Sequence, residues 1–351
     1  MPKVFDGKLC GGLSFIMIEN TDFYFQWHIT NVCNNRCKHC YHADYDKKNE
    51  MTTDQLLQIA DQIEDALEKW NFHSSMSITG GEPFTRKDDL FCLLDYLEEK
   101  CERVAHYDIL TNGTLITDDD IVRLKKYTKL RRIQVSMEGP TPESHDAVRG
   151  DGDFERVTNA IKKLKANGFV MSVMTTLTRN NMDLIPELIE LLGTLGVDYF
   201  ALERFMPEGQ GESNTSWTLS KEETKKIFDY MTEQAFKIKV PHLLLYRTLY
   251  CLCSDDNTVG AMCSAGVSAL TILPDATILP CRRLPIPIGN VLKDGIVNTW
   301  FNSEVLWQLR DYSSYKGKCN GCEHFLECRG CRSMAYLATG DFMQEDPQCW
   351  K

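Results

Sequence analysis

Short apolar or β-branched segments alternate with amphipathic segments through the first 200 residues, and this alternation constrains the fold more than any other feature. The strand-like segments are residues 23–29, 74–78, 104–110, 132–137, 169–177 and 197–203. Helical patterns lie between them, at residues 53–70, 88–100, 118–126, 154–166 and 182–195. Alternation of this kind is typical of parallel βαβ units, whose right-handed crossovers curl into a barrel. We therefore predict an α/β fold with a partial (β/α)6 barrel.

Polar or glycine-rich motifs follow five of the six predicted strands. They are Cys33-Asn34-Asn35-Arg36-Cys37-Lys38-His39-Cys40, Thr79-Gly80-Gly81-Glu82-Pro83, Thr111-Asn112-Gly113, Ser136-Met137-Glu138-Gly139 and Glu203-Arg204. Functional residues of a barrel collect at the C-terminal ends of its strands, so the five motifs should share one face.

The first motif is the most informative because it holds three cysteines, Cys33, Cys37 and Cys40. Three thiolates on one loop can hold three irons of a [4Fe-4S] cluster and leave the fourth iron open. An open metal position is typical of catalytic rather than structural sites. From this motif alone, part of a zinc site remains an alternative.

Composition limits the remaining possibilities. Of the fifteen cysteines, nine lie in the last 101 residues, and without a secretion signal metal ligation explains most of them better than disulfides do. The net charge of −11 argues against a nonspecific nucleic-acid binder. The sequence contains no apolar run of 18 residues, so no membrane span is predicted. Because no secretion signal is seen either, we expect a cytoplasmic protein.

The cysteine stretch, with His39 as the aromatic residue before the last cysteine, resembles the signature of the radical S-adenosylmethionine (SAM) enzymes, and the resemblance implies that His39 is a cofactor-binding residue. The resemblance implies that Gly80, Gly81 and Glu82 hold the amino group of SAM. It also implies that Ser136 and Glu138 bind its ribose or carboxylate, and that Arg149 pairs with its carboxylate. For Gly80, Gly81 and Glu82 the alternative is a simple Gly-Gly turn. For Ser136 and Glu138 it is a strand end that faces water, and for Arg149 it is a surface ion pair.

A second cysteine pattern resembles the SPASM extension of this family, which binds two auxiliary [4Fe-4S] clusters. The resemblance assigns the outer cluster to Cys319, Cys322, Cys328 and Cys349, and the inner one to Cys263, Cys281 and Cys331. The fourth inner ligand is Cys251, Cys253 or an open position. In the SPASM extension a glycine is usual in the hairpin turn, whereas this chain has Ala276 there. Spacing alone also permits two zinc-ribbon-like sites.

The predicted domains follow from these patterns. Residues 1–22 form a lead-in, residues 23–215 the barrel, residues 216–250 a bridging helix and linker, and residues 251–351 the small cysteine-rich SPASM domain.

The resemblance implies an enzyme with three [4Fe-4S] clusters that cleaves SAM reductively to a 5′-deoxyadenosyl radical and abstracts a hydrogen from its substrate. We expect a ribosomally made peptide or protein as substrate and a reductant such as flavodoxin or ferredoxin. Only 32 residues precede Cys33, so a separate leader-binding protein is a further expected partner. Side-chain modification of a tetrapyrrole or haem is the alternative substrate chemistry. A non-catalytic iron–sulfur protein is an alternative from another class.

Overall fold

The computed structural model describes residues 22–234, 242–245, 251–253, 257–259, 263–325 and 328–351. The predicted lead-in therefore lies almost entirely outside the described residues. The side chains of Cys251 and Cys253, two candidate ligands, also lie outside them.

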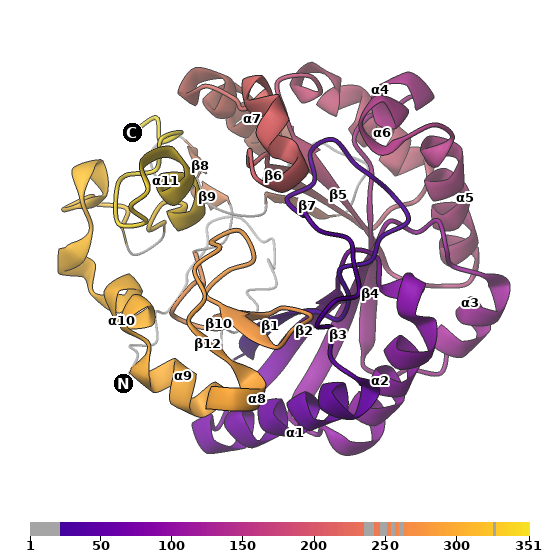
Figure 1. Ribbon diagram of the computed structural model, residues 1–351. Coiled ribbons are helices and arrows are strands. Elements are labelled where there is room, and N and C mark those ends of the chain that lie inside the picture. The colour runs from indigo at the N-terminus through magenta and orange to yellow at the C-terminus, as the bar shows by residue number, and fades with distance from the viewer. Residues whose placement is uncertain (1–21, 235–241, 246–250, 254–256, 260–262, 326–327) are drawn as a thin grey trace.

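A ten-stranded sheet of order β12-β11-β10-β1-β2-β3-β4-β5-β6-β7 curves through the molecule (Figure 1). Its parallel part is β1 (Asp22–His28), β2 (His73–Thr79), β3 (Val104–Thr111), β4 (Leu130–Ser136), β5 (Met171–Leu177), β6 (Tyr199–Arg204) and β7 (His242–Leu245). The six predicted strands are thus confirmed. The seventh, β7, lies in the segment predicted as a linker.

Helices cover the outer face of this sheet in a ring (Figure 1). They are α1 (Thr53–Trp70), α2 (Lys87–Lys100), α3 (Asp118–Leu124), α4 (Pro142–Arg149), α5 (Asp153–Ala166), α6 (Ile185–Thr194) and α7 (Lys221–Gln234), with the 3-10 turns η1 (Pro83–Arg86), η2 (Met182–Leu184) and η3 (Gly209–Trp217). Sequence reasoning missed α4, which is too short at 8 residues for a clear period. The helix predicted over residues 182–195 begins as η2.

The packing of α1 on β1 illustrates why these segments adopt their structures. Thr52 accepts a hydrogen bond from the backbone of Gln55, whose side chain bonds back to the Thr52 backbone, so a capping box begins the helix. Alternate residues of β1, Phe23, Phe25 and Trp27, are buried in the core between sheet and helices. The other set of β1 side chains, which includes His28, must therefore face the interior of the barrel.

The sheet also crosses the predicted domain boundary. Strand β10 (Ala269–Ile272) pairs in parallel with β1, and β11 (Thr277–Leu279) and β12 (Gly289–Asn290) continue from it in antiparallel fashion. In the β10–β11 turn, Ala276 has φ +66°, which is the left-handed region. This conformation explains why a glycine is usual at that position.

The remaining elements lie beside the barrel, in orange to yellow in Figure 1. They are α8 (Val291–Asp294), α9 (Ile296–Asn302), α10 (Glu304–Arg310), η4 (Tyr312–Ser314), η5 (Gly317–Cys319) and α11 (Arg332–Thr339), with a separate pair of strands, β8 (Cys251–Cys253) and β9 (Asn257–Val259). Among the helices of the described residues, none has both the length and the apolar composition needed to cross a bilayer.

Candidate active site

The cysteine loop follows β1, and the structure keeps its three thiols free and close together. Cys37 is buried, while Cys33 and Cys40 are half-buried. The pKa of Cys37 is raised to about 12, chiefly by burial; the charges of Cys40 and Cys33 contribute to the rise, whereas Arg149 opposes it. A thiol with a pKa raised in this way keeps its proton near neutral pH and loses it when a metal ion binds, which suits metal ligation.

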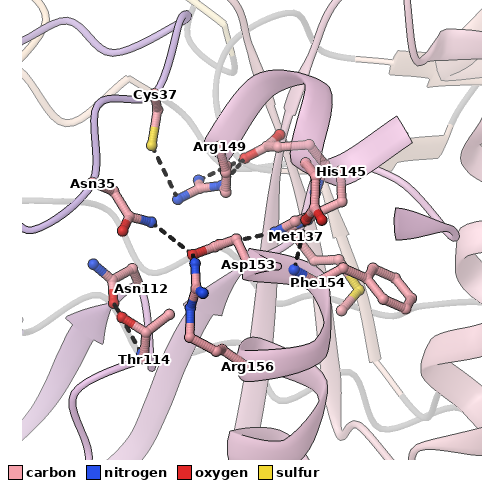
Figure 2. A network of polar contacts seen from close by, with 12 residues as sticks. Asn35, Cys37, Asn112, Thr114, Met137, His145, Arg149, Asp153, Phe154 and Arg156 are labelled. Carbon is pink, nitrogen blue, oxygen red and sulfur yellow. Dashed lines mark hydrogen bonds and ion pairs between the residues drawn. The ribbon is translucent and has the colours of Figure 1, made fainter. Parts of the chain in front are cut away.

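Arg149 connects this loop to the end of β4 (Figure 2). Its Nη1 lies 3.8 Å from Cys37 Sγ, while Nε and Nη2 donate to Glu138 Oε1 at 3.0 and 2.6 Å. His39 Nε2 lies 2.9 Å from the same oxygen. Burial opposes the charge on Glu138, but His39 and Arg149 together hold its pKa well below the usual range. The structure thus brings together three predicted cofactor-binding residues, His39, Glu138 and Arg149, and their contact with SAM stays a prediction.

A second buried network, which sequence reasoning missed, braces the cysteine loop from α4 and α5. Asp153 accepts a hydrogen bond from Asn35 Nδ2 at 2.9 Å and lies 3.0 Å from His145 Nε2 (Figure 2). His145 Nδ1 accepts a hydrogen bond from the backbone N–H of Glu138 at 3.1 Å, so Nε2 carries the ring hydrogen and donates a hydrogen bond to Asp153. His145 and Asp153 are fully buried. His145 is the member of this network that α4 supplies, so its partnership with Asp153 of α5 becomes visible only once α4 is placed.

The Gly80-Gly81-Glu82 motif packs directly against the cysteine loop. A Cβ on Gly80 would lie 2.6 Å from Thr30 O, and one on Gly81 would lie 2.4 Å from Asn31 O. Gly81 and Glu82 donate backbone hydrogen bonds to Thr30 O and Val32 O at 2.7 and 2.8 Å. The glycines therefore serve first to bring two backbone segments together.

The side chain of Glu82 is fully buried and joins β2 to the end of β3. Its oxygens accept from Phe84 N at 3.0 Å, Thr111 Oγ1 at 2.7 Å and Asn112 N at 2.6 Å. Burial raises the pKa of Glu82 to about 7, and these donors only partly offset the effect. A contact with the ammonium group of SAM would have to use the remaining lone-pair positions, and it stays a prediction.

Ser136 is the last residue of β4 and is half-buried. Its neighbour across the sheet is Met174 of β5. Its predicted contact with SAM is likewise a prediction.

The C-terminal cysteines fall into two groups in space. Cys263, Cys281 and Cys331 line one cavity with an empty volume of about 470 Å³, counted to its open mouth. Cys349 interacts electrostatically with Cys319 and Cys322. The first group holds the three cysteines predicted for the inner cluster, and the second holds three of the four predicted for the outer one. Within the described residues, however, no group of three or more His, Cys, Asp or Glu side chains could hold a metal ion as it stands, so ligation remains a prediction.

Buried arginines surround these C-terminal cysteines. Arg329 and Arg332 are each 1% exposed; Arg329 Nη1 donates to Cys263 O at 2.7 Å, and Arg332 Nη2 donates to Cys319 Sγ at 3.5 Å. Burial would raise the pKa of Cys331, but Arg204 and Arg283 bring it below its usual value. Positive charge of this kind favours thiolates and anionic clusters.

Comparison with known families decides the identity of this arrangement. The model of the radical SAM superfamily matches residues 27–192, and that of SPASM, an iron-sulfur cluster-binding domain, matches residues 263–323. The chain belongs to the radical SAM superfamily. It is a radical SAM enzyme with a C-terminal SPASM domain, and iron–sulfur clusters and SAM are the cofactors of such proteins.

Individual relatives of this radical SAM protein match more than nine-tenths of its length. It is 29% identical over 353 aligned positions to an AdoMet-dependent heme synthase from Methanosarcina barkeri, covering 95% of this chain and 98% of the relative. It is also 29% identical to the mycofactocin maturase MftC from Mycobacterium tuberculosis, covering 92% and 81%. The crystal structure of Streptococcus suis SuiB bound to precursor peptide SuiA has a TM-score of 0.74 at 17% identity, covering 94% and 76%, which shows a shared fold.

Proposed function

We propose that this radical SAM enzyme abstracts a hydrogen from a ribosomally made peptide or protein substrate. The observation that carries this proposal is the polar interior of the barrel below the cysteine loop. Polar side chains on neighbouring strands are in register across the sheet, in rows such as Gln26, Ser77, Asp108 and Arg132. Their neighbours along each strand, Trp27, Ile78, Ile109 and Ile133, are buried in the core between sheet and helices, so the polar row faces inward.

A peptide suits such a wall because its amide groups need both donors and acceptors. The next row toward the C-terminal ends of the strands contains Gln134, Ser172 and Tyr199, which offer both hydrogen-bond donors and acceptors. A flat apolar macrocycle would instead require apolar facing walls. SuiB, whose fold this chain shares, has been crystallised with its precursor peptide, which supports a peptide substrate.

In this proposal Cys33, Cys37 and Cys40 hold the first [4Fe-4S] cluster. When bound, the reduced cluster supplies the electron that cleaves the sulfonium bond of SAM. Arg149 offsets the negative charge of the thiolates at Cys37. Glu138 keeps Arg149 in place, and the Asn35–Asp153 hydrogen bond holds the loop that carries the cysteines.

We further propose two auxiliary clusters, which make three in all. Cys319, Cys322, Cys328 and Cys349 hold the outer cluster, and Cys263, Cys281 and Cys331 hold the inner one. The electrostatic contacts within each set and the buried arginines support these ligands. A one-electron protein donor such as flavodoxin or ferredoxin would deliver the reducing equivalent.

Tetrapyrrole side-chain modification is the second candidate function. The observation in its favour is the end-to-end match to the heme synthase, which spans 98% of that relative, whereas the match to the peptide maturase spans 81% of its length.

Mass spectrometry after anaerobic reaction separates the two candidates. The reconstituted enzyme, SAM and dithionite are incubated either with short peptides encoded near its gene or with propionate-bearing tetrapyrroles. We expect a mass change in a peptide that is absent with the Cys33→Ala variant and present with Cys92→Ala, a half-buried cysteine on α2. A mass change only in a tetrapyrrole would reject the peptide proposal.

A further inference from the structure

Four side chains gather between the loop that follows Cys40 and the loop that follows Cys281. The guanidinium carbon of Arg282 lies 4.2 Å from the ring centre of Tyr41. The Tyr41 ring lies 5.0 Å from that of His42, which lies 5.8 Å from His28 at the end of β1. The set thus lies between the loops of the two predicted cluster sites.

His28 is fully buried, yet neither ring nitrogen has a hydrogen-bond partner among the described residues. Nε2 of His42 and Nε of Arg282 are also buried without a partner. The backbone of Gly80 lies near both histidines, but not at an ordinary hydrogen-bond geometry. Buried polar atoms without partners are costly, and a group of them points to a bound ligand or water.

The chemistry of the missing partner follows from the charge of the cluster. Arg282 acts electrostatically on both histidines, so one cation and two imidazoles lie near one another. Among the described residues, no carboxylate lies within ion-pair distance of Arg282. The adjacent Arg283 differs, because Glu203 lies 2.7 Å from it. Glu208 interacts electrostatically with Arg282, and its own buried Oε2 has no hydrogen-bond partner among the described residues.

We propose that Arg282, His28 and His42 form a binding site for a carboxylate of the substrate. A guanidinium binds a carboxylate through paired hydrogen bonds, and each imidazole adds one N–H donor. The site rests on the proposed function, because it would orient the substrate between the first cluster and the inner auxiliary cluster. The carboxylate could come from an acidic peptide side chain or from a tetrapyrrole propionate, which are chemically alike.

Equilibrium binding to the anaerobically reconstituted holoenzyme tests this site without turnover. The probes are a glutamate-containing hexapeptide with its glutamine counterpart, and mesoporphyrin with its dimethyl ester. We expect one acid to bind at least about ten-fold tighter than its uncharged counterpart, because a charge-assisted hydrogen bond is worth that much. Which acid shows this preference identifies the source of the carboxylate.

Variants then assign the preference to the site. Arg282→Gln should abolish it and His28→Gln should weaken it, while the control Arg179→Gln, at an exposed pair with Glu223, should retain it. Iron content and thermal unfolding confirm that each variant is folded. Equal binding of acid and uncharged probes to the wild-type protein, no binding of either acid, or a preference that survives in Arg282→Gln would overturn the proposal. Failure of the proposed function would show separately, as a mass change that appears in a tetrapyrrole and in no peptide in the turnover experiment.

Discussion

Glu138 illustrates how much of this site depends on single buried charges. It is 1% exposed and Arg149 is 9% exposed, so neither charge is screened by water. Replacing Glu138 by Gln leaves Arg149 uncompensated and should lower the free energy of unfolding by about 3 kcal/mol. Urea unfolding measures the loss. The control Asp65→Asn removes an exposed pair with Lys69 and should cost less than about 1 kcal/mol. Equal losses in the two variants would contradict this account.

Glu82 gives the protein a pH dependence that can be measured near neutrality. Its folded pKa of about 7 lies above the ordinary value of 4.5, so the folded state binds the extra proton. The contribution of Glu82 to the free energy of unfolding is therefore fully present below pH 4.5. It is lost as the pH rises through 7, by about 3 kcal/mol in total. We expect most of this slope between pH 5 and 8 in the wild-type protein and none of it in Glu82→Gln.

Glu98 provides the control for that experiment. Burial opposes its charge, but donors from Lys129, Thr128 and Tyr107 outweigh burial and lower its pKa. Protonation of Glu98 therefore changes the free energy of unfolding only at acidic pH, at and below the ordinary carboxyl pKa. Glu98→Gln should thus leave the slope of stability between about pH 5 and 8 unchanged. A slope that persists in Glu82→Gln would show that another group titrates.

At the scale of elements, the close contact between the cysteine loop and the turn after β2 is the tightest constraint. A Cβ on Gly81 would lie within 2.5 Å of the backbone oxygens of Asn31 and Val32, which cannot move as a side chain can. Gly81→Ala should therefore destabilise the protein by about 3 kcal/mol and reduce its iron content. Gly168→Ala, at φ +86° with nothing within 4 Å, should cost about 1 kcal/mol and keep the iron. Full iron content in Gly81→Ala would argue against this packing role.

The elements that sequence reasoning found are those with a strong local period. The strands are short segments rich in apolar or β-branched residues, and α1 has both a capping box and a regular apolar face. The Arg149–Glu138–His39 contacts could not be found in this way, because they join three separate segments through a helix too short to predict. The orphaned nitrogens of His28 are visible only when its surroundings are known. The cysteine motifs were accessible because their spacing itself carries the chemistry.

At the scale of the whole molecule, one buried ion pair links the barrel to the cysteine-rich end. Arg204 at the end of β6 donates to both oxygens of Asp346 at 3.1 and 2.8 Å, and Cys331 N donates to Asp346 Oδ2 at 2.8 Å. Both charged residues are at most 4% exposed. The pair therefore ties β6 to the loop that holds a predicted ligand of the inner cluster.

Asp346→Asn should weaken the connection between the barrel and the cysteine-rich end of the chain. We expect a loss of about 3 kcal/mol in unfolding free energy, because Arg204 is left with a buried, uncompensated charge. The C-terminal cysteines should also react faster with a thiol reagent in the unreconstituted protein. Asp341→Asn, which breaks the more exposed pair with Lys316, serves as control. Similar thiol reactivity in both variants would show that the buried pair does not couple the two parts.

SAM cleavage by the reconstituted enzyme tests the central claim most directly. The measurement is 5′-deoxyadenosine formed under anaerobic conditions with dithionite, together with iron per chain. We predict product and about 12 iron per chain for the wild-type protein and for Cys92→Ala. The triple variant Cys33→Ala, Cys37→Ala, Cys40→Ala should give no product and about 8 iron. Product formation by the triple variant, or bound zinc in place of iron in the wild-type protein, would contradict the account.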